Sequence, residues 1–518
     1  MVWESEINEL EKRRELAYLM GTEDRVKRHH DRGHLTVRER ISLLVDSGSF
    51  RERGVLAGKA HYENSELKDF IPSNYVMGVA KLDGRPAVVG GDDFTVRGGA
   101  ADGAVGGKAG HAEKMARELR IPVVRMVDGT GGGGSVKTIE DLGRTYIPGN
   151  TNWDVIVNAM SEIPMVATAM GSIAGIGAAR VAASHFSIMI KGNSQVFIAG
   201  PPVVERAFGQ PIGKEELGGS GIHAHGSGVV DNEVDTEVEA FEQVRKFLSY
   251  LPSNSWEVPP KIESTDPIDR RDEELLSVIP KDRRKPHDIR ALLSHVLDRD
   301  SFFEIAPYFG PSLVVGLARL GGFSVGVIAN DPRKLGGSMD GAASDKFARF
   351  IDLFDTFNLP VINFVDQPGF MLGTAAENSG VARRGVRALA AVNQAVIPWA
   401  SIVIRRAFGV AGAGHQNHSR WNYRIAWPSG DWGSLPIEGG VMAAYRREIE
   451  EADDPEKRRE EIETRLNELR SPFRTAESFN IEDIIDPRDT RPLLCEWVEL
   501  AYKSLPTIVG PKFRGTRP

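Results

Sequence analysis

The sequence predicts an α/β protein built from two similar domains, and two observations carry this prediction. Two short apolar runs, a helix and a further apolar run follow one another in the first half of the chain and again in the second half. Identical residues recur 238 positions apart along these copies, among them Gly78 with Gly316, Lys108 with Lys346 and Asp128 with Asp366. Identity at one offset over such a length indicates an internal duplication.

The length of the chain agrees with two domains. At 518 residues it exceeds one ordinary core, so we expect one domain over residues 1–255 and a second over residues 256–518. Residues 251–288 are rich in proline and charge, as is typical of a connection between cores. A net charge of −8 without a long basic run argues against a nucleic-acid partner.

Cysteine content and hydropathy indicate the compartment. The single cysteine, Cys495, excludes an intrachain disulfide framework and fits a reducing cytoplasm. The first 15 residues have the pattern of an amphipathic helix, not of a secretory signal. The longest apolar stretch, residues 389–404, is interrupted by polar residues and Pro398, too soon for a membrane span. We therefore expect a cytoplasmic protein that does not contact membranes.

Taken in order, the chain begins with helices up to about residue 47. Thr36 and Glu39 have capping-box spacing at the start of one of them. Apolar runs and one helix follow in the order strand, strand, helix, strand, at residues 76–82, 85–91, 107–120 and 121–129. The preceding helix repeats at an offset of 252 instead of 238, which predicts a 14-residue insertion in the first half near residues 62–73. Residues 441–470 read as charged, solvated helix.

A glycine-rich turn occurs once in each copy. Residues 164–180, PMVATAMGSIAGIGAAR, correspond to residues 398–414, PWASIVIRRAFGVAGAG, with Gly175 matching Gly409 and Ile176 matching Val410. Such turns leave backbone N–H groups unhindered, and these donors can hold an oxygen that becomes negative during a reaction. Close strand-to-helix packing through glycine is the alternative. Two matching turns favour the catalytic interpretation.

Other chemical patterns are weak. Gly129, Gly131 and Gly134 fit G-x-G-x-x-G, but the following segment is broken at residues 148–150, so we do not expect a nicotinamide site. The pairs His415 with His418 and His223 with His225 lack further ligands, so no metal is expected. No G-x-S-x-G elbow is present, which argues against an ordinary serine hydrolase.

Several long motifs accompany the two turns. They are LTVRERI at 35–41, NSQVFIAGPPVV at 193–204, ELGGSGIHAHGSGVVD at 216–231, FVDQPGFMLGTAAE at 364–377 and RRG at 383–385. Together they resemble the carboxyltransferase β subunit of biotin-dependent acyl-CoA carboxylases, of the propionyl-CoA carboxylase type. The resemblance extends from about Arg28 to the C-terminus.

The resemblance implies two tandem crotonase-like ββα-superhelix domains. It also implies a homohexamer whose active sites lie between the first domain of one subunit and the second domain of another. Biotin would arrive on a separate biotin carrier, loaded by a biotin carboxylase, because no biotin-attachment motif or ATP-binding domain is visible. The expected reaction moves a carboxyl group from carboxybiotin to the α-carbon of an acyl-CoA, with no metal in this chain.

By position, the resemblance assigns residues to two oxyanion holes. Gly175 and Ile176 match the first hole, which faces the acyl-CoA thioester, and Gly409, Val410 and Ala411 match the second, which faces biotin. The residues expected to contact biotin or coenzyme A are Gly131, Gly132, Gly171, Phe370 and Ala413. Ala413 stands where related subunits vary with acyl-chain preference.

Two stretches depart from the pattern of this family. Residues 129–143 lack an arginine and a glutamate that the family often carries, and residues 431–440 replace a more usual V-M-G-x-x-G-A-V. These departures leave the acyl group open. Two alternatives remain: a biotin-dependent decarboxylase or transcarboxylase subunit that runs the same site in reverse, and a non-catalytic assembly paralogue.

Overall fold

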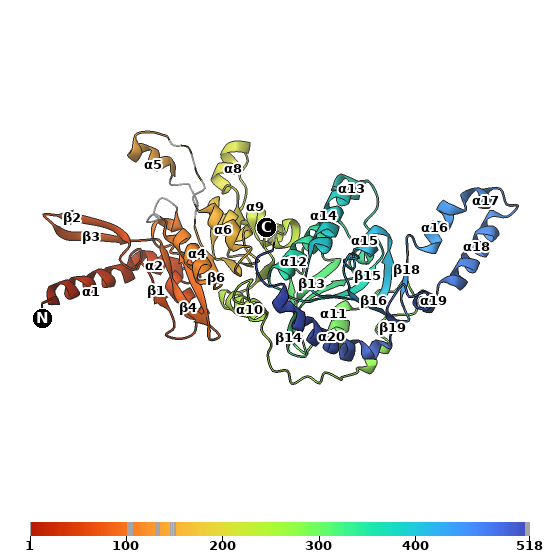
Figure 1. The fold of residues 1–518 in the computed structure, drawn as a ribbon. Coiled ribbons are helices and arrows are strands. Elements are labelled where there is room, and N and C mark those ends of the chain that lie inside the picture. The colour runs from red at the N-terminus through yellow and green to blue at the C-terminus, as the bar shows by residue number, and fades with distance from the viewer. Residues whose placement is uncertain are drawn as a thin grey trace. The chain divides into compact units, whose positions relative to one another are not determined.

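The computed structural model describes residues 2–100, 107–129, 135–145, 147, 149 and 152–512. The chain divides into two compact units (Figure 1). The first contains residues 1–256 together with the end of the chain from Gly510 on, and the second contains residues 257–509. Each unit has its own large β-sheet.

The first unit is built on a seven-stranded sheet with the order β1-β4-β5-β6-β7-β9-β11. The strands are β1 (Arg51–Glu52), β4 (Tyr75–Leu82), β5 (Arg85–Asp92), β6 (Val123–Val127), β7 (Met165–Ala169), β9 (Phe186–Ile190) and β11 (Asn232–Val234). β1, β4 and β5 pair antiparallel, and the remaining neighbours pair parallel. Asp83 and Gly84 connect β4 to β5 with positive φ angles, as a tight Asp-Gly hairpin requires.

Helices cover both faces of this sheet. They are α1 (Glu4–Tyr18), α2 (Glu23–His30), α3 (Val37–Leu44), α4 (Lys108–Leu119), α5 (Ser135–Leu142), α6 (Trp153–Ala159), α7 (Ile176–Ala182), α8 (Pro201–Phe208), α9 (Lys214–Gly218) and α10 (Glu237–Tyr250). Apolar residues of α4 and α6 form one core with β4–β7. On α10, the ring of Phe247 stacks on Phe186 of β9, with centroids 4.7 Å apart. The predicted capping box of Thr36 and Glu39 is confirmed at the start of α3.

The second unit contains an eight-stranded sheet with the order β12-β13-β14-β15-β16-β17-β19, and β18 pairs with β16. The strands are β12 (Phe303–Ile305), β13 (Leu313–Leu320), β14 (Phe323–Asn330), β15 (Val361–Gln367), β16 (Trp399–Phe408), β17 (Tyr423–Ala426), β18 (Asp431–Gly433) and β19 (Asp483–Ile484). The antiparallel pairs are again the first two, β12 with β13 and β13 with β14.

Ten helices are described in the second unit between residues 257 and 509. They are α11 (Ile289–Val296), α12 (Gly341–Thr356), α13 (Thr374–Asn378), α14 (Val381–Gln394), α15 (Gly409–Ala413), α16 (Ile437–Ala444), α17 (Arg446–Glu450), α18 (Pro455–Leu469), α19 (Pro472–Glu477) and α20 (Thr490–Ser504). Apolar residues of α11 and α20 pack on one face of the sheet. On the other face, Phe354 of α12 lies so close to Gly326 of β14 that a Cβ there would stand 2.6 Å from the ring.

The two units repeat one topology, which confirms the predicted duplication. The order β1-β4-β5-β6-β7 in the first unit matches β12-β13-β14-β15-β16 in the second, with the same sequence of antiparallel and parallel pairs. α4 and α12 stand at equivalent places, as do α7 and α15.

The predicted insertion in the first half is a β-hairpin. Strands β2 (Gly58–Glu63) and β3 (Glu66–Pro72) pair with each other and not with the large sheet. The second short sheet of this unit joins β8 (Ser172–Ala174) to β10 (Gln195–Phe197), beside the glycine-rich turn. In the part of the chain that the structure describes, no helix is long and apolar enough to cross a bilayer.

Candidate active sites

The first glycine-rich turn joins β8 to α7. Gly175 precedes the helix with φ of 62°, a conformation that favours glycine. Its N–H donates to the carbonyl of Phe197 at 3.2 Å. The N–H groups of Ile176 and Gly177, the first two residues of α7, have no acceptor among the described residues. These two donors are therefore the ones that can bind a ligand oxygen, and the Ile176 side chain beside them is 44% exposed.

Gly171 has a packing role in the same turn. A Cβ at this position would stand 2.2 Å from Oδ1 of Asp128, so only glycine lets the carboxylate approach. Asp128 accepts a hydrogen bond from Arg40 at 2.7 Å, and Arg40 also donates to both carboxylate oxygens of Glu237. All three side chains are buried. This ion-pair network fixes the chain just before the oxyanion donors.

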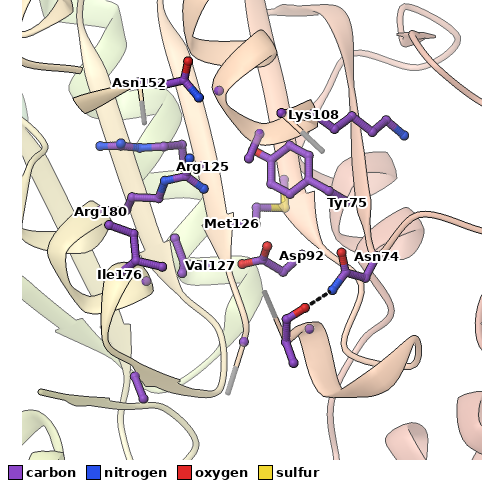
Figure 2. A pocket seen from close by; sticks show the side chains of 18 of the residues that line it. Asn74, Tyr75, Asp92, Lys108, Arg125, Met126, Val127, Asn152, Ile176 and Arg180 are labelled. Atoms are coloured by element: carbon purple, nitrogen blue, oxygen red, sulfur yellow. Dashed lines mark hydrogen bonds between the residues drawn. The ribbon is translucent and has the colours of Figure 1, made fainter. Parts of the chain in front are cut away.

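A cavity of about 410 Å³ lies beside the first turn of α7. Ile176 and Gly177 line it, together with the polar side chains of Tyr75, Asp92, Lys108, Arg125, Asn152 and Arg180 (Figure 2). These residues come from β4, β5, β6, α4, α7 and the start of α6. Oδ2 of Asp92 accepts the N–H of Asp128 at 3.0 Å. Burial raises the pKa of Asp92 to about 7.

Two arginines that line this cavity share a buried glutamate, Glu113, which is not part of the lining. Arg125 of β6 donates to Oε1 of Glu113 on α4 at 3.1 Å, and to the carbonyl of Ala183. Arg180 of α7 lies 3.6 Å from Oε2 of the same glutamate. Burial lowers the pKa of Arg125 from its usual value, although the guanidinium stays charged. The group carries one net positive charge.

The second glycine-rich turn joins β16 to α15. Gly409 has φ of 61°, close to that of Gly175. The N–H groups of Gly409, Val410 and Ala411 have no acceptor among the described residues. The Val410 side chain is 62% exposed, whereas Ala411 is buried. The two units therefore present similar backbone donors at equivalent places.

The strand before this turn is fixed by another buried ion-pair network. Asp366, which corresponds to Asp128, pairs with Arg405 at 2.7 Å and with Arg406 at 2.6 Å. Although burial acts to raise it, the pKa of Asp366 is held below its usual value by Arg406 and Arg405. The two equivalent carboxylates differ in their positive partners, since Asp128 pairs with Arg40 and Asp366 pairs with Arg405 and Arg406.

Of the remaining predicted contact residues, two lie in the second unit and two lie outside the described residues. Phe370 follows β15, and its ring packs against Gly385 of α14. Ala413 is the last residue of α15, is exposed, and its carbonyl lies 3.0 Å from Nε2 of His418. Gly131 and Gly132 lie outside the described residues. Their roles stay predictions.

The cavity residues were missed in the sequence. Asp92, Arg125 and Arg180 lie in stretches of apolar or small residues, where a single charged residue forms no recognisable motif. Arg125, within the apolar run IPVVRMVDG, is the residue that could have indicated the charged group. A charged residue in a buried strand needs a partner of opposite charge or a hydrogen bond. Among the described residues, no group of three His, Cys, Asp or Glu is placed to hold a metal ion.

A basic cleft of about 160 Å³ also lies on the first unit. Four arginines line it with Phe94 and His29, and these arginines are Arg25, Arg28, Arg32 and Arg97. The rings of His29 and Phe94 stack with centroids 5.6 Å apart. Guanidinium groups around an aromatic ring suit phosphate oxygens and a flat heterocycle.

Comparison with known proteins shows to which family this chain belongs. Residues 28–515 match the carboxyl transferase domain. The chain belongs to the carboxyl transferase family. It is 36% identical over 496 residues to the propionyl-CoA carboxylase carboxyltransferase subunit of Haloferax mediterranei, covering 95% of each chain. It is 31% identical to the methylmalonyl-CoA decarboxylase subunit alpha of Veillonella parvula, covering 91% of each.

A solved structure agrees with this assignment. The transcarboxylase 12S hexamer, crystallised with methylmalonyl-coenzyme A and methylmalonic acid, aligns with a TM-score of 0.87 and 29% identity over 99% of this carboxyl transferase and 96% of that chain. The predicted crotonase-like α/β fold and the predicted carboxyltransferase class are confirmed.

Proposed function

We propose that this carboxyltransferase moves a carboxyl group from carboxybiotin on a separate carrier protein to the α-carbon of a short acyl-CoA. Two turns with open backbone N–H groups, at equivalent places in the two units, carry this proposal. Each turn suits one developing enolate oxygen. Membership of the carboxyl transferase family supports the assignment.

The first unit would bind the acyl-CoA. The N–H groups of Ile176 and Gly177 would hold the thioester oxygen and stabilise the enolate that forms when the α-proton leaves. Gly175 would orient the turn, since its own N–H is bonded to Phe197. No acid–base side chain is needed at the α-carbon, because carboxybiotin supplies both the carboxyl group and, after its loss, the base.

The basic cleft gives the coenzyme A a place on the same unit. We assign its phosphates to the arginines at positions 25, 28, 32 and 97, and its adenine to the neighbourhood of the Phe94 ring. Arginine binds phosphate bidentately, so several of them retain a polyanion well. The Arg25→Gln and Arg32→Gln double variant should bind free coenzyme A at least tenfold more weakly, whereas Arg447→Gln, on exposed α17, should not change the affinity.

The second unit would bind the ureido oxygen of biotin. Gly409, Val410 and Ala411 supply the donors, and Asp366 with its two arginines holds the strand that leads to them. Assembly as a homohexamer, and delivery of biotin by a carrier loaded elsewhere, belong to this proposal. The hexamer of transcarboxylase 12S supports an oligomer.

A purified chain tests the proposal without its partners. It is incubated with free biotin and, in separate reactions, with malonyl-CoA, methylmalonyl-CoA and larger branched carboxyacyl-CoAs, and loss of CO2 is followed by mass spectrometry. Biotin-dependent loss from one of them is expected. No loss from any, together with no binding of coenzyme A, would overturn the proposal in favour of a non-catalytic subunit.

The reverse reaction is the second candidate, and one observation favours it. The 31% identical relative from Veillonella parvula is a methylmalonyl-CoA decarboxylase subunit. ATP dependence of the assembled complex separates the two: a carboxylase requires ATP and bicarbonate, whereas a decarboxylase complex releases CO2 without them.

A further inference from the structure

We propose that the cavity of the first unit selects an acyl-CoA whose acyl chain ends in a carboxylate. This inference rests on the proposed function, because it places the thioester oxygen at the N–H groups of Ile176 and Gly177. Both residues line the cavity, and so does Arg180. Arg180 stands four residues after Ile176 on α7, which separates their backbones by about 6 Å along the axis. An acyl chain that enters the cavity from the turn is therefore within reach of Arg180.

The charge of the cavity suits an anion. Arg125 and Arg180 share a single carboxylate, Glu113, so these three side chains carry one net positive charge. Asp92 is the remaining carboxyl group there, and burial keeps it largely protonated below neutral pH. A neutral Asp92 donates an O–H instead of repelling a second carboxylate.

The two guanidinium groups also have donors to spare. Arg125 is 2% exposed, yet its Nε has no hydrogen-bond partner among the described residues, and the same is true of Nε of Arg180. The guanidinium group of Arg180 lies 3.6 Å from Oε2 of Glu113, which is beyond hydrogen-bond distance. Both Nε atoms are shielded, so the donors that a ligand oxygen can reach are the terminal nitrogens of Arg180, which make no hydrogen bond to the described residues.

The duplication indicates that the fold itself does not need these charges. At the equivalent positions of the second unit, Arg125 is replaced by Asn363, Glu113 by Ile351 and Arg180 by Gly414. The strand order β12-β13-β14-β15-β16 repeats that of the first unit, although α15 ends at Ala413, just before the position equivalent to Arg180. The charged group is therefore a feature of the first unit alone, which is the unit assigned to the acyl-CoA.

Calorimetric binding to the full chain tests the inference with glutaryl-CoA and valeryl-CoA. The two thioesters have the same number of acyl carbons and differ in the terminal carboxylate. Glutaryl-CoA is expected to bind at least tenfold more tightly. Arg180→Met should bring the two affinities to within threefold of each other.

A second variant changes the result in the opposite direction. Glu113→Gln keeps the shape of the side chain but frees both arginines, so the preference for glutaryl-CoA should grow severalfold. Arg117→Met on α4 is the matched control, because Arg117 pairs with Glu162 and does not line the cavity. It should leave the ratio as in the wild type.

The outcomes separate this inference from the proposed function. Equal affinity for glutaryl-CoA and valeryl-CoA in the wild type, or a preference that Arg180→Met retains, would overturn the inference and make the charged group purely structural. Tight binding of propionyl-CoA in that case would leave the proposed function standing. If no thioester binds at all, both fail.

Discussion

Asp92 and Asn330 occupy equivalent positions in the two units and accept the same hydrogen bond. Oδ2 of Asp92 accepts the N–H of Asp128 at 3.0 Å, and Oδ1 of Asn330 accepts the N–H of Asp366 at 3.0 Å. An amide oxygen therefore satisfies this N–H without a charge. The ionisable group at Asp92 is an addition of the first unit, and it faces the cavity.

Replacing Asp92 by asparagine should remove a pH-dependent loss of stability. The pKa of Asp92 is about 7 in the folded protein, far above its value in an unfolded chain, so its stabilising contribution is complete below about pH 4 and is lost as the pH rises through 7. Arg180, Asp128 and Arg40 face this carboxyl group and set its pKa after burial. The free energy of unfolding of Asp92→Asn should equal that of the wild type near pH 4. At pH 8 it should be larger by up to about 4 kcal/mol, as measured by thermal unfolding.

The matched control for this measurement is Asp69→Asn on the exposed hairpin β2–β3. It should leave the pH dependence of unfolding as in the wild type. If the free energy of unfolding changed with pH in the same way for Asp92→Asn and the wild type, Asp92 would not be protonated in the folded protein as assigned.

Proline at Ile176 should abolish turnover while preserving the fold. Ile176 is the first residue of α7, where proline is tolerated because the helix does not use that N–H. Losing one oxyanion donor lowers kcat by roughly 10² to 10³. The measurement is biotin-dependent decarboxylation of methylmalonyl-CoA, with Ile176→Ala as the control that keeps the donor and should stay within fivefold of wild type. Equal rates for the two variants would exclude the N–H of Ile176 from the mechanism.

Proline at Val410 makes the corresponding test in the second unit. Val410→Pro should reduce the same reaction about 10²-fold or more, whereas Val410→Ala should not, because only proline removes the N–H. Binding of propionyl-CoA should be unchanged in both variants, since the proposal places biotin on this unit. Weakened acyl-CoA binding in Val410→Pro would contradict that division of roles.

Removing Arg40 should destabilise the first unit strongly. Arg40 lies 2.7 Å from Asp128 and 2.7 Å from Glu237, and Arg40→Met would leave two buried carboxylates without a counter-charge. Such a loss costs roughly 3–5 kcal/mol. Arg447→Met, which breaks an exposed pair with Glu451, should cost about 0–1 kcal/mol. Calorimetric unfolding of both variants measures the difference, and similar transition temperatures would contradict the role of Arg40.

Much of the fold was predictable from the sequence because the same pattern of residues occurs in both halves of the chain. Identical residues at one offset predicted the duplicated sheets, and the change of offset predicted an insertion that the structure reveals as the hairpin β2–β3. The glycine turns were predictable as well, since positive φ at Gly175 and Gly409 restricts those positions to glycine.

The hydrogen bonding inside the turns was less predictable. Gly175 was expected to donate to a substrate oxygen, but its N–H bonds to Phe197, and the open donors of the first turn are Ile176 and Gly177. Gly171 was expected at a ligand, whereas the structure places it against Asp128. Which N–H remains open depends on a carbonyl more than twenty residues away along the chain, and a local pattern carries no information on it.

The sequence alone determined the duplication, the two glycine-rich turns and the resemblance to the family, because each is written in the order of residues along the chain. Tertiary structure alone decided that Glu113, Arg125 and Arg180 form one charged group beside Asp92. These residues belong to α4, β6 and α7, and they meet because neighbouring parallel strands deliver their connections to one edge of the sheet. Burial in that shared place also raises the pKa of Asp92, since a carboxylate there would be separated from water.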